Sequence, residues 1–252
     1  MFLKKVTLLE DKVHSFDQYP YSIPAIHRMT EIEMTKPVTF FVGENGAGKS
    51  TLLEAIADKC GFHTAGGGRN NTYEVDRSAA DLSEAIRLSW LPKVTNGFFL
   101  RAESFYQFAS HVESTKSLHA YGYKSLHEQS HGESFMSLFL NRFNERSAIY
   151  LLDEPEAALS PQRQLSFLRI IHDLTAGGGA QFIIATHSPI LLGFPGADIL
   201  NFDDGMNKID YEDTDHYQIT SYFLRHREKM IADLFEETNG SERDDFDDNS
   251  HT

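Results

Sequence analysis

Residues 43–51 combine residue types that bind phosphate and the magnesium ion that accompanies it. The stretch reads Gly-Glu-Asn-Gly-Ala-Gly-Lys-Ser-Thr, which matches the phosphate-loop pattern G-x-x-x-x-G-K-S. Glycines let the backbone turn its N–H groups toward a phosphate chain. Lys49 supplies a cation for the outer phosphates, and Ser50 offers a hydroxyl to Mg²⁺. We therefore predict a nucleotide phosphate site made of Gly43, Glu44, Asn45, Gly46, Ala47, Gly48, Lys49, Ser50 and Thr51.

The segments on either side of this loop agree with the motif. An apolar run at residues 38–42 precedes it, and residues 52–57 follow with a helical pattern. Strand, glycine turn and helix is the context that a phosphate loop requires. The positive end of a helix beginning near Gly48 would add to the attraction for phosphate.

Two later apolar runs each end in residues that can do chemistry. Residues 148–152 are followed by Asp153 and Glu154, and residues 181–186 are followed by His187. In a phosphate-loop sheet, ligands bind at the carboxyl ends of the strands. Asp153 is predicted to hold Mg²⁺, directly or through water, and Glu154 to polarise a water for attack on the γ-phosphate. His187 could donate to the γ-phosphate or to that water; a lone histidine at a strand end is more often structural, but its position at the same sheet edge as Asp153 favours a functional role.

Composition bounds the class of protein. The chain has 252 residues, 40% of them apolar, and a net charge of −14. The single Cys60 excludes an internal disulfide and favours a reducing compartment. Neither a signal peptide nor an apolar stretch long enough to span a bilayer is recognisable, so we expect a cytoplasmic protein without membrane insertion. The acidic balance does not indicate nucleic acid as a partner, although a local basic strip remains compatible with it.

Apolar strands that alternate with helices indicate an α/β fold with a mostly parallel sheet and flanking helices. We expect an N-terminal β portion, with a strand at 1–9 and a short second strand at 23–26. We also expect helices at 77–89, 161–173 and 220–235, and a hairpin at 198–211. A single domain is predicted to span 1–235, with a small helical lobe at about 103–145. Residues 236–252 hold seven acids and one base and are predicted to be an acidic disordered tail.

Three motifs together carry a family resemblance. The phosphate loop, Leu-Leu-Asp-Glu-Pro-Glu-Ala-Ala-Leu-Ser-Pro at 151–161 and Ala-Thr-His-Ser-Pro at 185–189 resemble the ATP-binding-cassette class of ATPases. They are most similar to stand-alone cytosolic AAA-type members related to chromosome-maintenance and recombination ATPases. The resemblance implies a phosphate-loop NTPase of ATP-binding-cassette type that binds ATP with Mg²⁺ and hydrolyses it, with Glu154 and His187 as catalytic residues.

The same resemblance points to a second half-site. In this class a Leu-Ser-Gly-Gly-Gln-type signature binds the γ-phosphate held by a partner protomer. Gln129–Ser134 is similar to it: Ser130 and Gly132 match, whereas His131 and Glu133 depart. An ordinary helix cap is the alternative. If these residues are the signature, ATP would be bound between two copies of the chain.

Other positions depart from the class or leave a choice open. Ser160 stands where the class usually has Asp. The class also has a Gln that senses Mg²⁺ between the first motif and the signature; here Glu103, as an oxygen ligand, or Gln107 could replace it. Tyr19 and Tyr21 precede the phosphate loop and could stack on adenine, with loop packing as the alternative.

Three functions remain to be weighed. We favour an ATP-driven dimerisation switch that acts on a partner protein or nucleic acid; the alternative is the nucleotide-binding subunit of a membrane transporter. A module that only holds ATP would need neither Glu154 nor His187. Residues 207–210, Asn-Lys-Ile-Asp, spell a guanine-reading motif, but they follow a glycine turn and are better explained as a hairpin strand.

Overall fold

The functional motifs are carried by a six-stranded sheet. In the computed structural model, which describes residues 1–62, 80–102 and 147–240, the strand order is β5-β6-β7-β3-β8-β9. The strands are β3 (Val38–Val42), β5 (Asn96–Arg101), β6 (Ala148–Asp153), β7 (Ala180–Ala185), β8 (Asp198–Asn201) and β9 (Asn207–Lys208). The first five strands of this order are parallel, and β9 pairs antiparallel with β8. The predicted α/β class with a mostly parallel sheet is confirmed.

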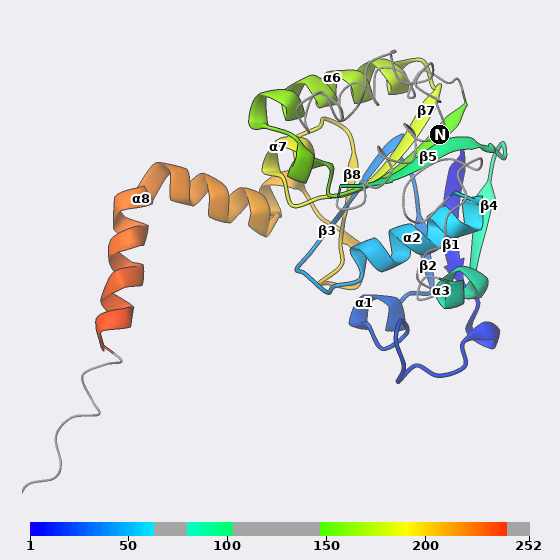
Figure 1. Cartoon of the computed structure of the whole chain (residues 1–252), viewed down its shortest axis with the longest axis horizontal. Coiled ribbons are helices and arrows are strands. Elements are labelled where there is room, and N and C mark those ends of the chain that lie inside the picture. Colours follow the sequence, from blue (N-terminus) through cyan, green and yellow to red (C-terminus); the bar gives the residue numbers. More distant parts are fainter. Residues whose placement is uncertain (63–79, 103–146, 241–252) are drawn as a thin grey trace, which may run out of the picture. The chain divides into compact units, whose positions relative to one another are not determined.

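Both faces of this sheet are buried, which explains the continuous apolar runs in its strands. On one face, Phe41, Ile149 and Leu151 pack in a cluster with α2 (Lys49–Cys60). On the other face, Phe40 and Tyr150 pack in a second cluster with α6 (Pro161–Ala176) and α7 (Pro189–Leu192). Figure 1 shows α2 and α6 on opposite sides of the strands. Successive residues of one strand therefore pack in different hydrophobic clusters. Because both faces of the sheet are buried, these strands do not alternate between apolar and polar residues.

A smaller antiparallel sheet forms the N-terminal β portion. Its order is β2-β1-β4, with β1 at Leu3–Leu8, β2 at Glu31–Glu33 and β4 at Ile86–Trp90. The short helices η1 (Glu10–Lys12), α1 (Pro24–His27) and α3 (Ala80–Ala85) accompany it. The strand predicted at 1–9 is confirmed. The strands β2 and β4 were not predicted, since each depends on pairing with the distant β1.

Two predicted elements are wrong. Residues 24–27 form the helical turn α1 rather than a strand. Pro24 occupies its first position, where a missing N–H costs nothing, and Ala25 and Ile26 are buried by it. The helix predicted at 77–89 is shorter: α3 ends at Ala85, and Ile86 begins β4. The helix predicted at 161–173 is confirmed, and so is the 198–211 hairpin, where Lys208 binds Asp198.

The last described residues belong to a separate compact unit. The chain divides into Met1–Tyr211 and Glu212–Thr252. The second unit continues from η5 (Tyr211–Asp213) into α8 (Asp215–Gly240), which has non-helical dihedral angles at His226. The helix predicted at 220–235 is therefore confirmed and longer, and it continues through 236–240 of the predicted tail. Residues 241–252 lie outside the described residues, as does the whole of the lobe predicted at 103–145.

One buried side chain joins the two sheets. Gln181, the second residue of β7, is fully buried. Its Oε1 accepts the backbone N–H groups of Phe2 and Leu3 at 2.8 Å each, and its Nε2 donates to the Leu3 carbonyl at 2.9 Å. The start of β1 is therefore tied to the central sheet by three hydrogen bonds from one amide.

Replacing Gln181 with alanine is expected to lower the free energy of unfolding by about 3 kcal/mol, because two buried N–H groups and one carbonyl lose their partner. For a chain of this size, this corresponds to a fall in Tm of roughly 6–12 °C. Thermal denaturation followed by circular dichroism measures it. Gln162→Ala, at an exposed position of α6, is the control; equal effects from both variants would contradict the joining role.

Candidate functional site

The phosphate loop lies between β3 and α2, as its motif predicts. Gly43, Gly46 and Gly48 have positive φ angles of 138°, 86° and 100°, which only glycine adopts without strain. At Gly48 a Cβ would also lie 2.9 Å from the Cγ2 atom of Ile23. These glycines turn the loop around the N-terminus of α2, where free N–H groups and the helix dipole favour an anion.

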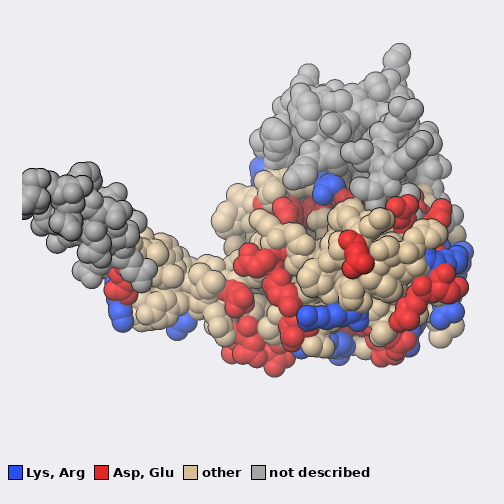
Figure 2. Space-filling view, turned by 90° about the horizontal axis from the view of Figure 1, so that it is seen from below, with Lys and Arg blue, Asp and Glu red and all other residues tan. Residues whose placement is uncertain are grey.

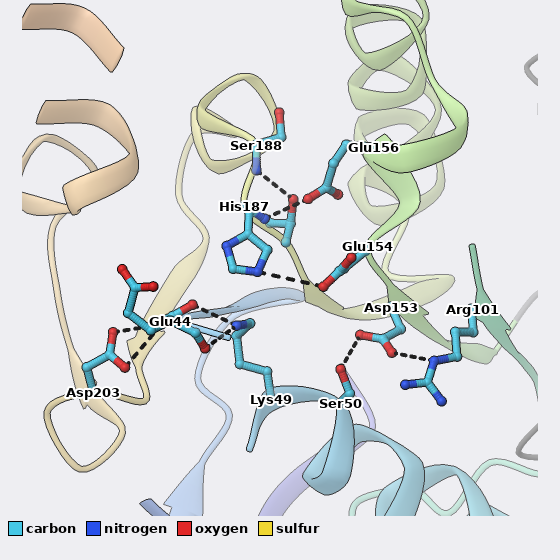
Figure 3. A network of polar contacts seen from close by, with 12 residues as sticks. Glu44, Lys49, Ser50, Arg101, Asp153, Glu154, Glu156, His187, Ser188 and Asp203 are labelled. Carbon is cyan, nitrogen blue, oxygen red and sulfur yellow. Dashed lines mark hydrogen bonds and ion pairs between the residues drawn. The ribbon is translucent and has the colours of Figure 1, made fainter. Parts of the chain in front are cut away.

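Lys49 lies across this loop. Its side-chain ammonium donates to the carbonyl oxygens of Gly43 at 2.6 Å and Glu44 at 2.9 Å. The residue is only 4% exposed. Burial lowers the pKa of Lys49 from its usual value, and nearby carboxylates, first Glu154 and then Asp203, oppose that shift. The cation is thus held at the loop by backbone oxygens and surrounded by acidic groups (Figure 3).

The strand-end residues predicted from the sequence are brought to the same edge of the sheet. Asp153, the last residue of β6, accepts the Ser50 hydroxyl on Oδ1 at 2.9 Å. Glu154 follows it with a left-handed backbone, φ 49° and ψ 51°. The imidazole Nε2 of His187, which follows β7 and Thr186, lies 3.7 Å from Oε1 of Glu154. Figure 3 shows these side chains beside Lys49.

The left-handed conformation of Glu154 is uncommon for a residue with a Cβ. Such conformations cost about 1–3 kcal/mol and persist where the surrounding structure requires them. Here the Glu154 N–H donates to the Ala185 carbonyl at 2.9 Å, which joins the ends of β6 and β7. The turn directs the Glu154 carboxylate toward His187.

A small pocket of about 20 Å³ lies between Ser50, Arg101, Asp153 and Glu154. Its oxygen-rich lining suits a hard cation such as Mg²⁺, and its volume suits one small ion or water. Ser50 and Asp153, two of the three predicted magnesium ligands, both line this pocket, together with the Arg101 side chain. Glu103, the third predicted ligand, lies outside the described residues, as do Ser130 and Gly132 of the predicted signature.

Three further residues of the site were not predicted. Arg101 ends β5 and places its Nε 3.2 Å from Asp153 Oδ2 and its Nη1 2.5 Å from Glu54 Oε1. Asp203, just after β8, accepts the Glu44 N–H with both oxygens, at 3.1 and 3.0 Å. Glu156 accepts the His187 N–H. Arg101 is the last residue of one parallel strand and Asp203 comes shortly after another, so the strand-end rule that pointed to Asp153 could have found them.

The two tyrosines that precede the loop have different surroundings. Tyr21 is buried, its hydroxyl donates to the Asp81 carbonyl at 2.9 Å, and its ring packs edge-on against Phe16. This fits the packing alternative. Tyr19 is 56% exposed, and its hydroxyl lies 3.3 Å from that of Thr51 at the start of α2. Of the two, Tyr19 is the one whose side chain is exposed to solvent.

Two family models match the chain. One is described as an AAA domain and matches residues 14–150. The other is described as an AAA domain, putative AbiEii toxin, Type IV TA system, and matches residues 125–193. The first covers more than half of the chain and includes the phosphate loop.

Curated relatives include two ATP-binding proteins. The chain is 34% identical over 158 residues to the cytochrome c biogenesis ATP-binding export protein CcmA of Rhodopseudomonas palustris, which covers 59% of this chain and 77% of the relative. It is 28% identical over 156 residues to the zinc import ATP-binding protein ZnuC of Vibrio cholerae, which covers 60% of this chain and 56% of the relative.

Among solved structures, the SMC head domain from Thermotoga maritima aligns with a TM-score of 0.46 and 17% identity, over 80% of this chain and 94% of that one. The ATP-binding cassette MJ1267 of an ABC transporter aligns with a TM-score of 0.46 and 18% identity, over 84% and 93%. One family model spans more than half of this chain, and the chain covers 77% of CcmA, to which it is 34% identical. The chain therefore belongs to the AAA-domain phosphate-loop ATPases of ATP-binding-cassette type.

Proposed function

We propose that this ATPase is a nucleotide-driven dimerisation switch in which two chains close on two ATP molecules and open after hydrolysis. The observation that carries the proposal is the exposure of the phosphate loop: Glu44, Asn45 and Gly46 are all exposed, although Lys49 below them is buried. A γ-phosphate bound there would present its outer oxygens to a second chain. Binding that depends on this phosphate favours the closed state only while ATP is intact.

Within one chain, the proposed roles follow the geometry. The loop from Gly43 to Thr51 cradles the phosphates, and Lys49 neutralises the outer ones. Ser50 and Asp153 would hold Mg²⁺, which supplies positive charge to the phosphate oxygens when bound. Glu154 accepts a proton from the attacking water, and His187 donates to the γ-phosphate. Glu103 remains a proposed further oxygen ligand, and Tyr19 a proposed adenine contact.

The opposite chain would complete each site. From the resemblance of Gln129–Ser134 to the class signature, we propose that Ser130 and Gly132 contact the γ-phosphate held by the partner. Such a dimer is two-fold symmetric, with the same two surfaces used on both chains. The net charge of −14 opposes association, so the nucleotide must bridge the interface.

The variant Glu154→Gln is expected to be largely dimeric with MgATP and largely monomeric without nucleotide or with ADP, because slow hydrolysis preserves the bridging γ-phosphate. Adding Ser130→Arg is expected to break the dimer and to leave ATP binding by each monomer intact, since the added cation enters only the partner's site. Light scattering measures the mass. Ser166→Arg, at an exposed position of α6, is the matched control. A dimer that survives Ser130→Arg, or that forms equally without nucleotide, would show that residues 129–134 are only a helix cap.

A second candidate function, the nucleotide-binding subunit of a membrane transporter, is favoured by the names of the two relatives, an export and a zinc import ATP-binding protein. None of the helices in the described ranges is long and apolar enough to cross a bilayer. Purification of tagged Glu154→Gln with MgATP from membrane and soluble extracts of the native cell distinguishes the candidates: a transporter subunit should co-purify with an integral membrane protein.

Nucleic acid as the partner of the switch remains a weaker proposal. On the face of the first unit seen in Figure 2, Asp and Glu side chains lie among the Lys and Arg side chains. Binding to nucleic acid usually requires basic groups gathered on one face or stripe. ATPase rates measured with and without DNA test it, and we propose a cytoplasmic partner protein first.

A further inference from the structure

Glu156 joins the two strand ends that carry the proposed catalytic residues. It lies in the turn η4 (Pro155–Ala158) that follows β6, two residues after Glu154. Its Oε1 accepts the backbone N–H of His187 at 2.6 Å. In Figure 3 the Glu156 carboxylate faces the end of β7 rather than the phosphate loop. A side chain in the turn after β6 is thus hydrogen-bonded to the backbone at the end of β7.

The second carboxylate oxygen of Glu156 differs from the first in its surroundings. Among the residues that the structure describes, Oε2 is buried and has no hydrogen-bond partner. Burial raises the pKa of Glu156, and the hydrogen bonds from His187 and Thr186 oppose that shift. A buried oxygen without a partner costs about 1–3 kcal/mol. A buried acid kept at such a cost is typical of functional sites.

The anchored backbone determines where the His187 ring lies. The Nε2 atom of this ring is 3.7 Å from Glu154 Oε1, and the ring can keep this distance only while its own backbone stays in place. The next residue has an independent anchor: the Ser188 hydroxyl donates to Gln164 Oε1 at 2.5 Å, and Gln164 Nε2 donates to the Leu159 carbonyl at 3.1 Å. Because this second anchor remains, loss of the Glu156 carboxylate should shift His187 without unfolding the segment.

We propose that Glu156 is a positioning residue that fixes the His187 imidazole relative to the Glu154 carboxylate during ATP hydrolysis. The proposal rests on the roles proposed above for Glu154 and His187. Since the Glu156 carboxylate is directed at the protein backbone and not at the phosphate loop, its removal should change turnover and leave nucleotide affinity unchanged.

The variant Glu156→Ala is expected to lower kcat about 10-fold or more, because small displacements of a catalytic group cost rate steeply, and to change KM for MgATP less than about 3-fold. Glu156→Gln keeps an acceptor oxygen for the His187 N–H and should retain kcat within about 3-fold of the wild type. Steady-state ATPase assays measure both constants. Glu84→Ala, at an exposed position of α3, is the control. If Glu156→Ala does not fold, Glu156→Met, of similar volume and without an acceptor, replaces it.

A double-mutant cycle with His187→Ala tests whether Glu156 acts through His187. If it does, Glu156→Ala should slow the wild type but not the His187→Ala variant, since the ring that it positions is already absent. Equal slowing in both backgrounds, a Glu156→Ala enzyme as fast as the wild type, or a Glu156→Gln enzyme as slow as Glu156→Ala would each overturn the proposal. If Glu154→Gln and His187→Ala themselves leave hydrolysis near wild type, the proposed catalytic roles fail. If they slow it and Glu156→Ala does not, only the positioning role fails.

Discussion

Replacing Lys49 with alanine is expected to abolish detectable ATP binding. The Lys49 ammonium is buried beneath the phosphate loop and bound to the Gly43 and Glu44 carbonyls. It lies among carboxylates that include Glu154 and Asp203. Without this cation, the outer phosphates of ATP would meet a site in which the nearest charged groups repel them. Charge-assisted contacts to phosphate are also among the stronger hydrogen bonds in proteins.

Isothermal titration with MgATP measures the loss. The control is Lys59→Ala, which removes an exposed lysine near the other end of the same helix α2, so that a general effect of reduced positive charge is separated from the local one. Thermal denaturation of both variants without nucleotide shows whether the loop change also affects folding. An affinity for ATP that is unchanged by Lys49→Ala would remove the assignment of residues 43–51 as the phosphate site.

The second large effect is expected at Glu154. Glu154→Gln should keep ATP binding and slow hydrolysis by roughly 10²-fold or more, the scale for loss of a positioned general base. The amide has nearly the same shape as the carboxylate but cannot accept a proton from water. We expect this role because Glu154 lines the pocket that it forms with Ser50, Arg101 and Asp153, and because its Oε1 lies 3.7 Å from Nε2 of the His187 imidazole.

Single-turnover assays with saturating enzyme separate the chemical step from product release, and titration with MgATP checks that binding is retained. Glu84→Gln makes the same chemical change at an exposed position of α3 and should leave the rate unchanged. Hydrolysis by Glu154→Gln at a rate near that of the wild type would mean that another group orients the water.

Much of the fold followed from local sequence signals. The phosphate loop depends on a contiguous motif, and its glycines occupy backbone conformations that other residues adopt only with strain. The strands β3, β6 and β7 could be recognised because both faces of a parallel sheet are buried, which leaves apolar runs without alternation. The carboxyl ends of parallel strands meet at one edge, and so the sequence was enough to predict that Asp153, Glu154 and His187 lie near the loop.

Other features depended on which distant segments meet, and no local pattern contains that information. The strand β4 exists because residues 86–90 pair with β1, whereas the same residues taken alone fit the end of a helix. Gln181 looks like a lone polar residue in an apolar run until the N–H groups of Phe2 and Leu3 are found against it. Burial of such groups requires partners, but the sequence does not say from which part of the chain they come.

In the candidate site, too, some features were determined by the sequence and others by the tertiary structure. Sequence alone determined the types of groups present: a phosphate loop with its lysine and serine, an acid pair after one strand and a histidine after another. Only the tertiary structure decided their partners, because the order β5-β6-β7-β3-β8 brings Arg101 beside Asp153, Glu156 beside His187 and Asp203 beside Glu44. Hydrogen bonds form between groups within about 3 Å, and residues 31 to 159 positions apart in sequence reach that distance only through the packing of the sheet.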